Sequence, residues 1–195
     1  LRRPRCIQAG ATMGDAAPVQ FPQRIGQSGR TVVEHVIVGQ VHRAHIAGEP
    51  FRDPSGTRLR DWLGIDEATF YDSNRVAIVP MGFCFPGYDA KGGDLPPRRE
   101  CGRTWHDALF AALPPFALRL CIGRYALSYH LPQTRRRPLT DIVGDWRAIL
   151  AETAPQAVPA LPHPSWRNNG WLRRNPWFEA ELLPELRARV AAALS

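Results

Sequence analysis

Four short apolar runs alternate along the chain with longer segments of helical periodicity. The apolar runs lie at 32–40, 75–82, 117–123 and 156–162. Short continuous apolar runs between turn residues are typical of strands that are buried on both faces. The segments with apolar residues at helical spacing lie at 57–65, 101–113, 124–131, 139–153 and 175–194. We therefore expect strands and helices to alternate.

This alternation predicts an α/β fold with a parallel sheet and helices on both of its faces. Ligands of such sheets bind at the carboxyl ends of the strands. The residues that follow the four apolar runs are "GQVH", "PMGFCFPG", "GRYA" and "LPHPS". Unusual polar and aromatic residues therefore gather where this architecture places a site. We expect a single domain over 1–195 with a loop-rich N-terminal segment at 1–31.

Composition narrows the class of function. The chain has 195 residues, 44% of them hydrophobic, and a formal net charge of +7, which favours a polyanionic partner. Lys91 is its only lysine and "GxxxxGK[ST]" is absent, which disfavours a P-loop nucleotidase. No run of 18 or more apolar residues and no apolar leader is present, so we expect no membrane partner and a cytoplasmic location.

Metal and nucleophile chemistry find little support. The cysteines are scattered and form no CxxC pair. His42 and His45 are three residues apart, but no cysteine or carboxylate lies beside them at ligand spacing, so a zinc site is disfavoured. "GxSxG" is also absent, which argues against a hydrolase with a nucleophile elbow.

The strongest candidate for chemistry is "HPSWRNN" at 163–169. His163 lies between two prolines, which restrict the backbone on either side of it and suit the ring to one directed hydrogen bond. Ser165 is able to hold a phosphate, and Trp166 and Arg167 are able to stack on bases or wedge between them. A surface turn with a solvated histidine is the simpler alternative.

Two further segments follow the first predicted strand. In "GEPFRDPSG", Phe51 offers an aromatic face, although such a residue is more often part of a core. Asp53 in the same segment is typical of a turn or a helix cap. In "GQVHRAH", Gln40 and His42 lie just beyond the strand.

Taken in order, these segments resemble the uracil-DNA glycosylase superfamily from about residue 34 to the end. "VIVGQ" resembles the first motif, "GEPFRDPSG" the segment whose phenylalanine stacks on uracil, "CIGRYAL" the third-strand glycine turn, and "LPHPSWRN" the second motif. The resemblance implies a three-layer α/β/α sandwich with a central four-stranded parallel sheet. It also implies base flipping, since the glycosidic bond of a stacked nucleotide is out of reach inside a duplex.

The resemblance assigns a role to each candidate. His163 donates a hydrogen bond to uracil O2 as charge develops on the leaving base. The substrate-binding positions it implies are Gly39, Phe51, Met81, Gly82 and Phe83. The DNA-binding positions are Ser165, Trp166, Arg167, Asn168 and Asn169.

The sequence departs from the family pattern in two motifs. The first motif lacks the usual aspartate or asparagine that positions the attacking water, and Gln40, His42 and Asp53 all stay open for that role. The asparagine that usually reads the uracil edge is also missing, with "VPMGF" in its place. Backbone groups of residues 81–83 are expected to do that work, and a broader substrate range follows.

The cysteines bear on a possible iron-sulfur cluster. Cys84 and Cys101 fall where one class of these glycosylases places two of four cluster ligands, but only Cys6 is available for the N-terminal pair. An all-cysteine cluster needs four thiolates, so we expect no cofactor. The chain then resembles an atypical branch without a cluster, such as the Bradyrhizobium-type class.

The expected function is excision of uracil from single- or double-stranded DNA by a bacterial monomer, with free uracil as a product. The alternative is a catalytically weakened DNA-binding module that retains uracil or abasic sites. It is motivated by the altered "GQVHRAH" motif.

Overall fold

A computed structural model describes residues 33–36, 50–82, 86–92, 95–112, 116–153 and 158–195, with the backbone alone for the first of these ranges. The strands are β1 (Val33–Val36), β2 (Val76–Ile78), β3 (Arg119–Ile122) and β4 (Ala160–Leu161). They pair in parallel in the order β2-β1-β3-β4. The predictions of an α/β fold and of parallel strands are confirmed, although the strands are shorter than the apolar runs.

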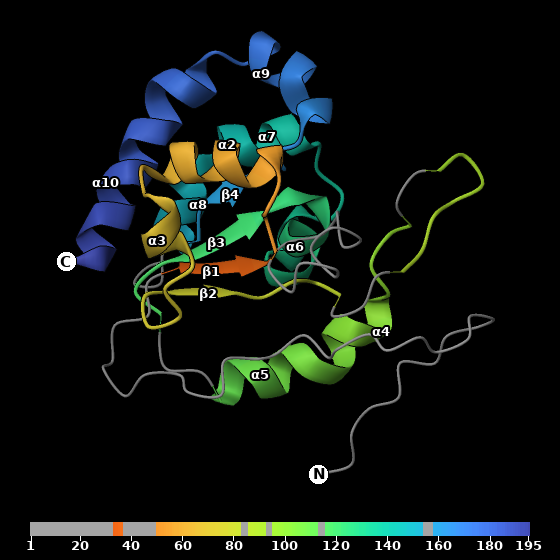
Figure 1. Ribbon diagram of the computed structural model, residues 1–195. Coiled ribbons are helices and arrows are strands. Elements are labelled where there is room, and N and C mark those ends of the chain that lie inside the picture. Colours follow the sequence, from red (N-terminus) through yellow and green to blue (C-terminus); the bar gives the residue numbers. More distant parts are fainter. Residues whose placement is uncertain (1–32, 37–49, 83–85, 93–94, 113–115, 154–157) are drawn as a thin grey trace.

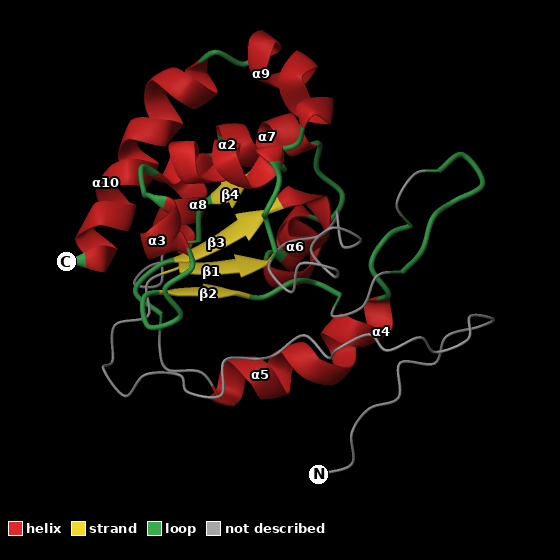
Figure 2. Cartoon of the chain, viewed as in Figure 1, coloured by secondary structure: helices red, strands yellow, loops and turns green. Residues whose placement is uncertain are grey.

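Helices surround this small sheet (Figures 1 and 2). The α-helices before β3 are α2 (Pro54–Leu63), α3 (Glu67–Phe70), α4 (Arg99–Cys101) and α5 (Asp107–Ala112). Those after it are α6 (Gly123–His130), α7 (Leu139–Gly144), α8 (Trp146–Glu152), α9 (Asn169–Arg174) and α10 (Leu183–Leu194). Two of these helices were not expected from the sequence, namely α3 and α9, whereas α4, the π turn after it and α5 together form the helix predicted at 101–113.

Short turns of other helical types interrupt these elements. Turns of 3-10 helix occur at Pro132–Thr134 and Trp166–Asn168, and π-helical turns at Gly102–His106 and Phe178–Leu182. Proline removes a backbone N–H and clashes with the carbonyl four residues earlier. The π turn at Phe178–Leu182 ends two residues before Pro184 and includes Ala180, four residues before this proline, so the wider turn accommodates Pro184 within the predicted C-terminal helix.

The core divides into two clusters because side chains of a strand alternate between its faces. Leu120 and Ile122 of β3 belong to the first cluster, whereas Cys121 between them belongs to the second. The first cluster contains buried residues of α2, α3 and α10. The second contains buried residues of α6, with Phe110 of α5 packed against it. Helices therefore bury apolar surface on both faces of the sheet.

The strand direction identifies the edge of the sheet at which a ligand site is expected. The arrowheads of β1, β2 and β3 point to the side on which α6 lies (Figure 1). Helix α6 begins at Gly123, the residue directly after β3. The chain therefore leaves the carboxyl ends of its strands on this side.

A helix that could span a membrane is not found in the part of the chain that the structure describes.

Buried histidines beside the second cluster predict a dependence of stability on pH. Burial lowers the pKa of His130 to about 3, and the charge of Arg119 and the ring of His106 act in the same direction. The unfolded chain takes up this proton near pH 6.5, so the stabilisation is present above that pH and is lost as pH falls toward 3. We expect the urea midpoint of unfolding to fall over this interval.

His130→Phe isolates this contribution. The variant has no proton to take up at position 130, so its urea midpoint should fall less steeply below pH 6.5 than that of the unaltered protein. Some slope remains, because burial also lowers the pKa of His106 and of His163. Equal slopes for the two proteins would contradict the assignment.

Candidate functional site

The described residues contain most of the predicted site. They include Phe51, Asp53, Met81, Gly82 and the whole of 163–169. Gly39, Gln40, His42 and Phe83 lie outside the described residues, so their predicted roles stay predictions. Two described segments carry most of the candidate site, the turn that precedes α2 and the segment that follows β4.

Phe51 occupies a constrained position at the start of this turn. It has a φ of 67°, and it is the one residue other than glycine with a positive φ in the described part of the chain. Its ring is buried, with 7% of the residue exposed, and packs edge-on against Phe70 with 6.0 Å between ring centroids. A bulky residue in this region of φ stores about 1–3 kcal/mol of strain, which is typical of functional positions.

Gly56 makes this conformation of Phe51 feasible. A Cβ atom at Gly56 would lie 1.8 Å from the backbone oxygen of Phe51, so no other residue fits there without a shift of the backbone. Asp53 is the N-cap of α2, and its Oδ1 accepts a hydrogen bond of 3.0 Å from the Gly56 N–H. The expectation that Asp53 caps a helix is confirmed. The close approach at Gly56 and the cap by Asp53 together place the backbone of Phe51 against the first turn of α2.

His163 follows β4, and its ring is held in one orientation. The Ser165 N–H donates to Nδ1 of His163 over 3.2 Å, and the side-chain amide of Asn168 donates to its backbone oxygen over 2.7 Å. Gly123, with a φ of 81°, backs the ring, since a Cβ atom there would lie 3.6 Å from the His163 Cβ. The alternative of a solvated histidine is therefore wrong for this ring, whose Nε2 is buried, although Trp166 and Arg167 of the same segment are exposed.

The hydrogen bond at Nδ1 also fixes the tautomer. A nitrogen that accepts a hydrogen bond carries no proton, so the neutral ring carries its proton on Nε2. Nε2 is buried and has no hydrogen-bond partner among the described residues. A buried donor without a partner costs about 1–3 kcal/mol, and a ligand oxygen at this point would satisfy it.

The electrostatic surroundings keep this ring neutral. Burial lowers the pKa of His163, the positive charge of Arg167 lowers it further, and the carboxylate of Asp53 acts in the opposite direction. His163 is therefore an uncharged hydrogen-bond donor at neutral pH. Its ring lies 6.4 Å from that of Phe51, centroid to centroid, with a tilt of 31° between the planes.

The other side chains of residues 163–169 differ in their exposure and in their contacts. Trp166 is 70% exposed, and the guanidinium of Arg167 lies 5.9 Å from the centroid of its ring. Asn168 instead holds the backbone of His163, as described above. Asn169, the first residue of α9, accepts a hydrogen bond of 2.8 Å from Arg58 through its Oδ1. Of the predicted DNA-binding residues, Trp166 thus offers the largest free apolar surface.

Arg58 is a residue of this site that the sequence analysis missed. Its Nη1 lies 3.2 Å from the backbone oxygen of Pro164 and 3.3 Å from that of Ser165. Together with Asn169, these contacts join α2 to the segment that carries His163. Their partners lie 106–111 positions away in the sequence, and no local motif indicates such a contact.

Met81 and Gly82 lie beyond the end of β2 and are both buried. The side chain of Met81 belongs to the second core cluster, and its Cε would lie 3.3 Å from a Cβ atom at Gly102. Its side chain is therefore engaged in packing. The role expected for the backbone groups of residues 81–83 in contacting the base stays a prediction.

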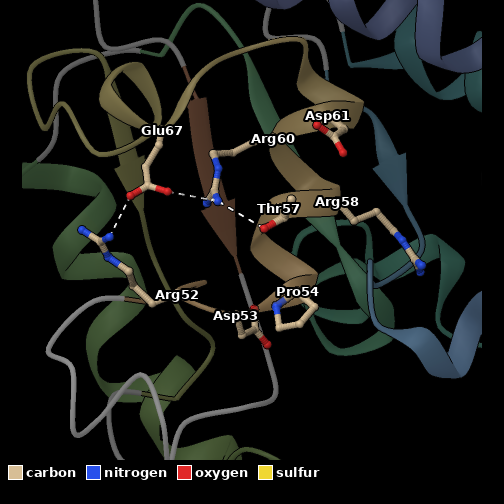
Figure 3. Close-up of a pocket in the computed structure, with 8 residues that line it drawn as sticks. All are labelled: Arg52, Asp53, Pro54, Thr57, Arg58, Arg60, Asp61 and Glu67. Carbon is tan, nitrogen blue, oxygen red and sulfur yellow. Dashed lines mark hydrogen bonds and ion pairs between the residues drawn. The ribbon is translucent and has the colours of Figure 1, made fainter.

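A hollow of about 610 Å³ lies beside the first turns of α2 (Figure 3). Glu67 crosses one side of it, with Oε1 2.7 Å from Arg52 Nη1 and Oε2 3.2 Å from Arg60 Nη2. Arg58 extends from the opposite side of the helix, away from this ion-pair network (Figure 3). Arg52, Arg60 and Glu67 thus satisfy one another on one side of the hollow.

Metal binding finds no support in the described part of the chain, where no three His, Cys, Asp or Glu residues gather in a way that could hold an ion. Of the three cysteines considered for a cluster, Cys101 is described and carries a free thiol. Cys6 and Cys84 lie outside the described residues. The expectation that no cluster is bound stays a prediction.

Comparison with known families assigns the chain to one superfamily. The family model described as "Uracil DNA glycosylase superfamily" matches residues 27–187, well over half of the chain. The matched range includes both segments of the site, the turn around Phe51 and the segment around His163.

The state of His163 can be tested without a ligand. Nitrogen-15 NMR of the imidazole should show the proton on Nε2 and a pKa below 6.5, because burial disfavours the charged ring. Asp53→Asn keeps a capping side chain but removes the carboxylate charge, so it should lower this pKa further. Arg167→Ala should raise it. A proton on Nδ1, or shifts of the opposite sign, would contradict the geometry.

Proposed function

The chain belongs to the uracil DNA glycosylase superfamily, and on this premise we propose that it removes uracil from DNA. In this proposal the enzyme flips a deoxyuridine out of the strand and hydrolyses its N-glycosidic bond. The products are free uracil and an abasic site. In this proposal the substrate is single- or double-stranded DNA that contains uracil.

The observation that carries the proposal is the Nε2–H of His163, which has no hydrogen-bond partner among the described residues and lies beside the ring of Phe51. Uracil leaves with negative charge developing on its O2, and a fixed neutral donor stabilises that charge without having to reorganise. A planar base that stacks on the ring of Phe51 would lie next to the imidazole of His163. The ring of Phe51 already packs against Phe70, and the Ser165 N–H already orients His163, so the pocket is organised before DNA binds.

The residues after His163 support the base-flipping step. A flipped base leaves a gap in the stack, and an exposed aromatic side chain is suited to fill it. Trp166 has this exposure, and Arg167 beside it carries a charge for the adjacent phosphates. Ser165 is the proposed phosphate contact at the start of this turn. The side chain of Asn168 instead supports His163, and that of Asn169 contacts Arg58.

The attacking water still needs a residue to position it. Asp53 lies close enough for its charge to raise the pKa of His163, so a carboxylate is present near the reacting base. We propose Asp53 for stabilising the positive charge that develops on the sugar. Gln40 and His42 remain proposals for the water, with Gly39 and the backbone of 81–83 for binding of the base.

The family also suggests the finer architecture and setting. We propose that the four strands form the central sheet of a three-layer α/β/α sandwich, in agreement with the core clusters on its two faces. We further propose that the enzyme acts as a monomer, in the compartment that holds the DNA, and without a cofactor.

A second candidate is a DNA-binding module that retains uracil or abasic sites with little or no catalysis. The altered "GQVHRAH" motif favours it, because this motif lacks the usual residue for the attacking water. Phe51 and His163 would bind the base in both cases. Only the hydrolysis step separates the two functions.

The two site residues should affect excision strongly in single-turnover assays. His163→Ala removes the donor to uracil O2 and should slow excision about 10²- to 10³-fold. Phe51→Leu keeps apolar volume in the core but removes the aromatic face, so it should weaken binding of the base. His130→Phe replaces a partly buried histidine at the end of α6, outside the candidate site, and should leave excision unchanged. Unimpaired excision by His163→Ala and Phe51→Leu would overturn the assignment.

The alternative function is distinguished by product and retention. Prolonged incubation of a uracil oligonucleotide with excess protein, followed by alkali, cleaves the strand at an abasic site if hydrolysis occurs. An intact strand that remains tightly bound would instead favour the binding module. An intact strand without retention would count against both.

A further inference from the structure

We propose that Arg58 is a positioning residue that holds residues 163–169, the His163 segment, against α2 and so fixes His163 relative to Phe51. This inference rests on the proposed function for its catalytic meaning, but its geometric content is independent of it. Arg58 touches neither of the two rings. It acts through the backbone of the His163 segment.

The first step of the argument is the direction in which Arg58 points. Ser55, Leu59, Trp62 and Leu63 form the buried face of α2 at helical spacing. Arg58 borders this face and is partly buried, whereas Thr57 and Asp61 are exposed. Its guanidinium therefore emerges at the margin of the core, beside the chain that leaves β4.

The second step is the set of acceptors. Nη1 has two N–H groups, and three oxygens surround it. The side chain of Asn169 is the nearest, at 2.8 Å, and the carbonyls of Pro164 and Ser165 at 3.2 and 3.3 Å share the remaining N–H. These acceptors precede and follow Trp166, so one charged group holds both ends of the turn that Trp166 occupies.

The third step connects this contact to the reacting groups. Ser165 is the residue whose N–H orients Nδ1 of His163, and Arg58 binds the carbonyl of the same residue. Within the same N-terminal half of α2, Asp53 caps the helix and Gly56 leaves room for the backbone of Phe51. Helix α2 is thus a brace between the two rings. Loss of the Arg58 contacts would release one end of this brace.

Lysine at position 58 gives a test that keeps the charge. Its single ammonium on a flexible stem does not reproduce the planar guanidinium, so most of the contacts with the His163 segment should be lost. Arg60→Lys is the matched control, because it makes the same change two residues further along α2 at a side chain that pairs with Glu67 instead. Arg58→Ala is the stronger variant.

The first readout is the pKa of His163 in the free protein, measured by NMR. In the unaltered protein the causes acting on this pKa are burial and the charges of Arg167 and Asp53. A released segment admits water to the ring, so Arg58→Lys and Arg58→Ala should move the pKa upward toward 6.5 while Arg60→Lys leaves it unchanged. An unmoved pKa in both Arg58 variants would overturn the proposal. This readout stands even if the protein excises no uracil.

The second readout is the single-turnover excision rate at saturating DNA. Displacement of a catalytic group by about 1 Å costs up to about 10²-fold, so Arg58→Ala should be slower by about tenfold to a hundredfold. Arg58→Lys should lie between it and the unaltered protein, and Arg60→Lys should match the unaltered protein. Full activity of Arg58→Ala would overturn the positioning role. Absence of excision in the unaltered protein would instead refute the proposed function and leave the pKa readout to decide on Arg58.

Discussion

The close approach between the Phe51 carbonyl and Gly56 is the constraint on which the geometry of the site depends. It holds Phe51 at a positive φ that an aromatic residue rarely adopts, and it does so at the first turn of α2. The cap by Asp53 and the packing of α2 in the core prevent this turn from relaxing. The strain is therefore stored where an aromatic face is presented beside His163.

The electrostatics of the site follow from burial and from one hydrogen bond. Burial keeps His163 neutral, and the Ser165 N–H decides that its proton lies on Nε2. A neutral donor in a fixed direction suits a leaving group that gains negative charge, because it stabilises the transition state more than the uncharged base. The charge of Asp53 raises the pKa of His163 and that of Arg167 lowers it, so the two charges oppose each other at this ring.

Much of the fold could be predicted because burial leaves a local pattern. The apolar runs identified the strands, and the alternation of helices and strands indicated parallel pairing, as the structure has it. Short elements gave no such signal. Helix α9, with six residues, is too short to show a periodicity, and the π turn before Pro184 depends on backbone geometry.

Some residues of the candidate site could likewise be found from the sequence and others could not. "HPSWRNN" and "GEPFRDPSG" stood out because of their residue types, and both lie in the site. The solvated histidine considered for His163 was wrong, since its ring packs beside Gly123 at the start of α6 and its Nε2 is buried. Arg58 could not be found, because its acceptors are backbone carbonyls and an amide far along the chain. An arginine inside a helix looks like any solvated arginine until its partners are known.

The central claim is that this pocket releases uracil from DNA, and direct detection of the free base tests it most simply. The unaltered protein is incubated in excess with oligonucleotides that carry uracil or thymine at the same position, and the released base is identified by chromatography and mass spectrometry. We predict free uracil from the first oligonucleotide in both single- and double-stranded form. No released base from the uracil oligonucleotide in either form would contradict the account.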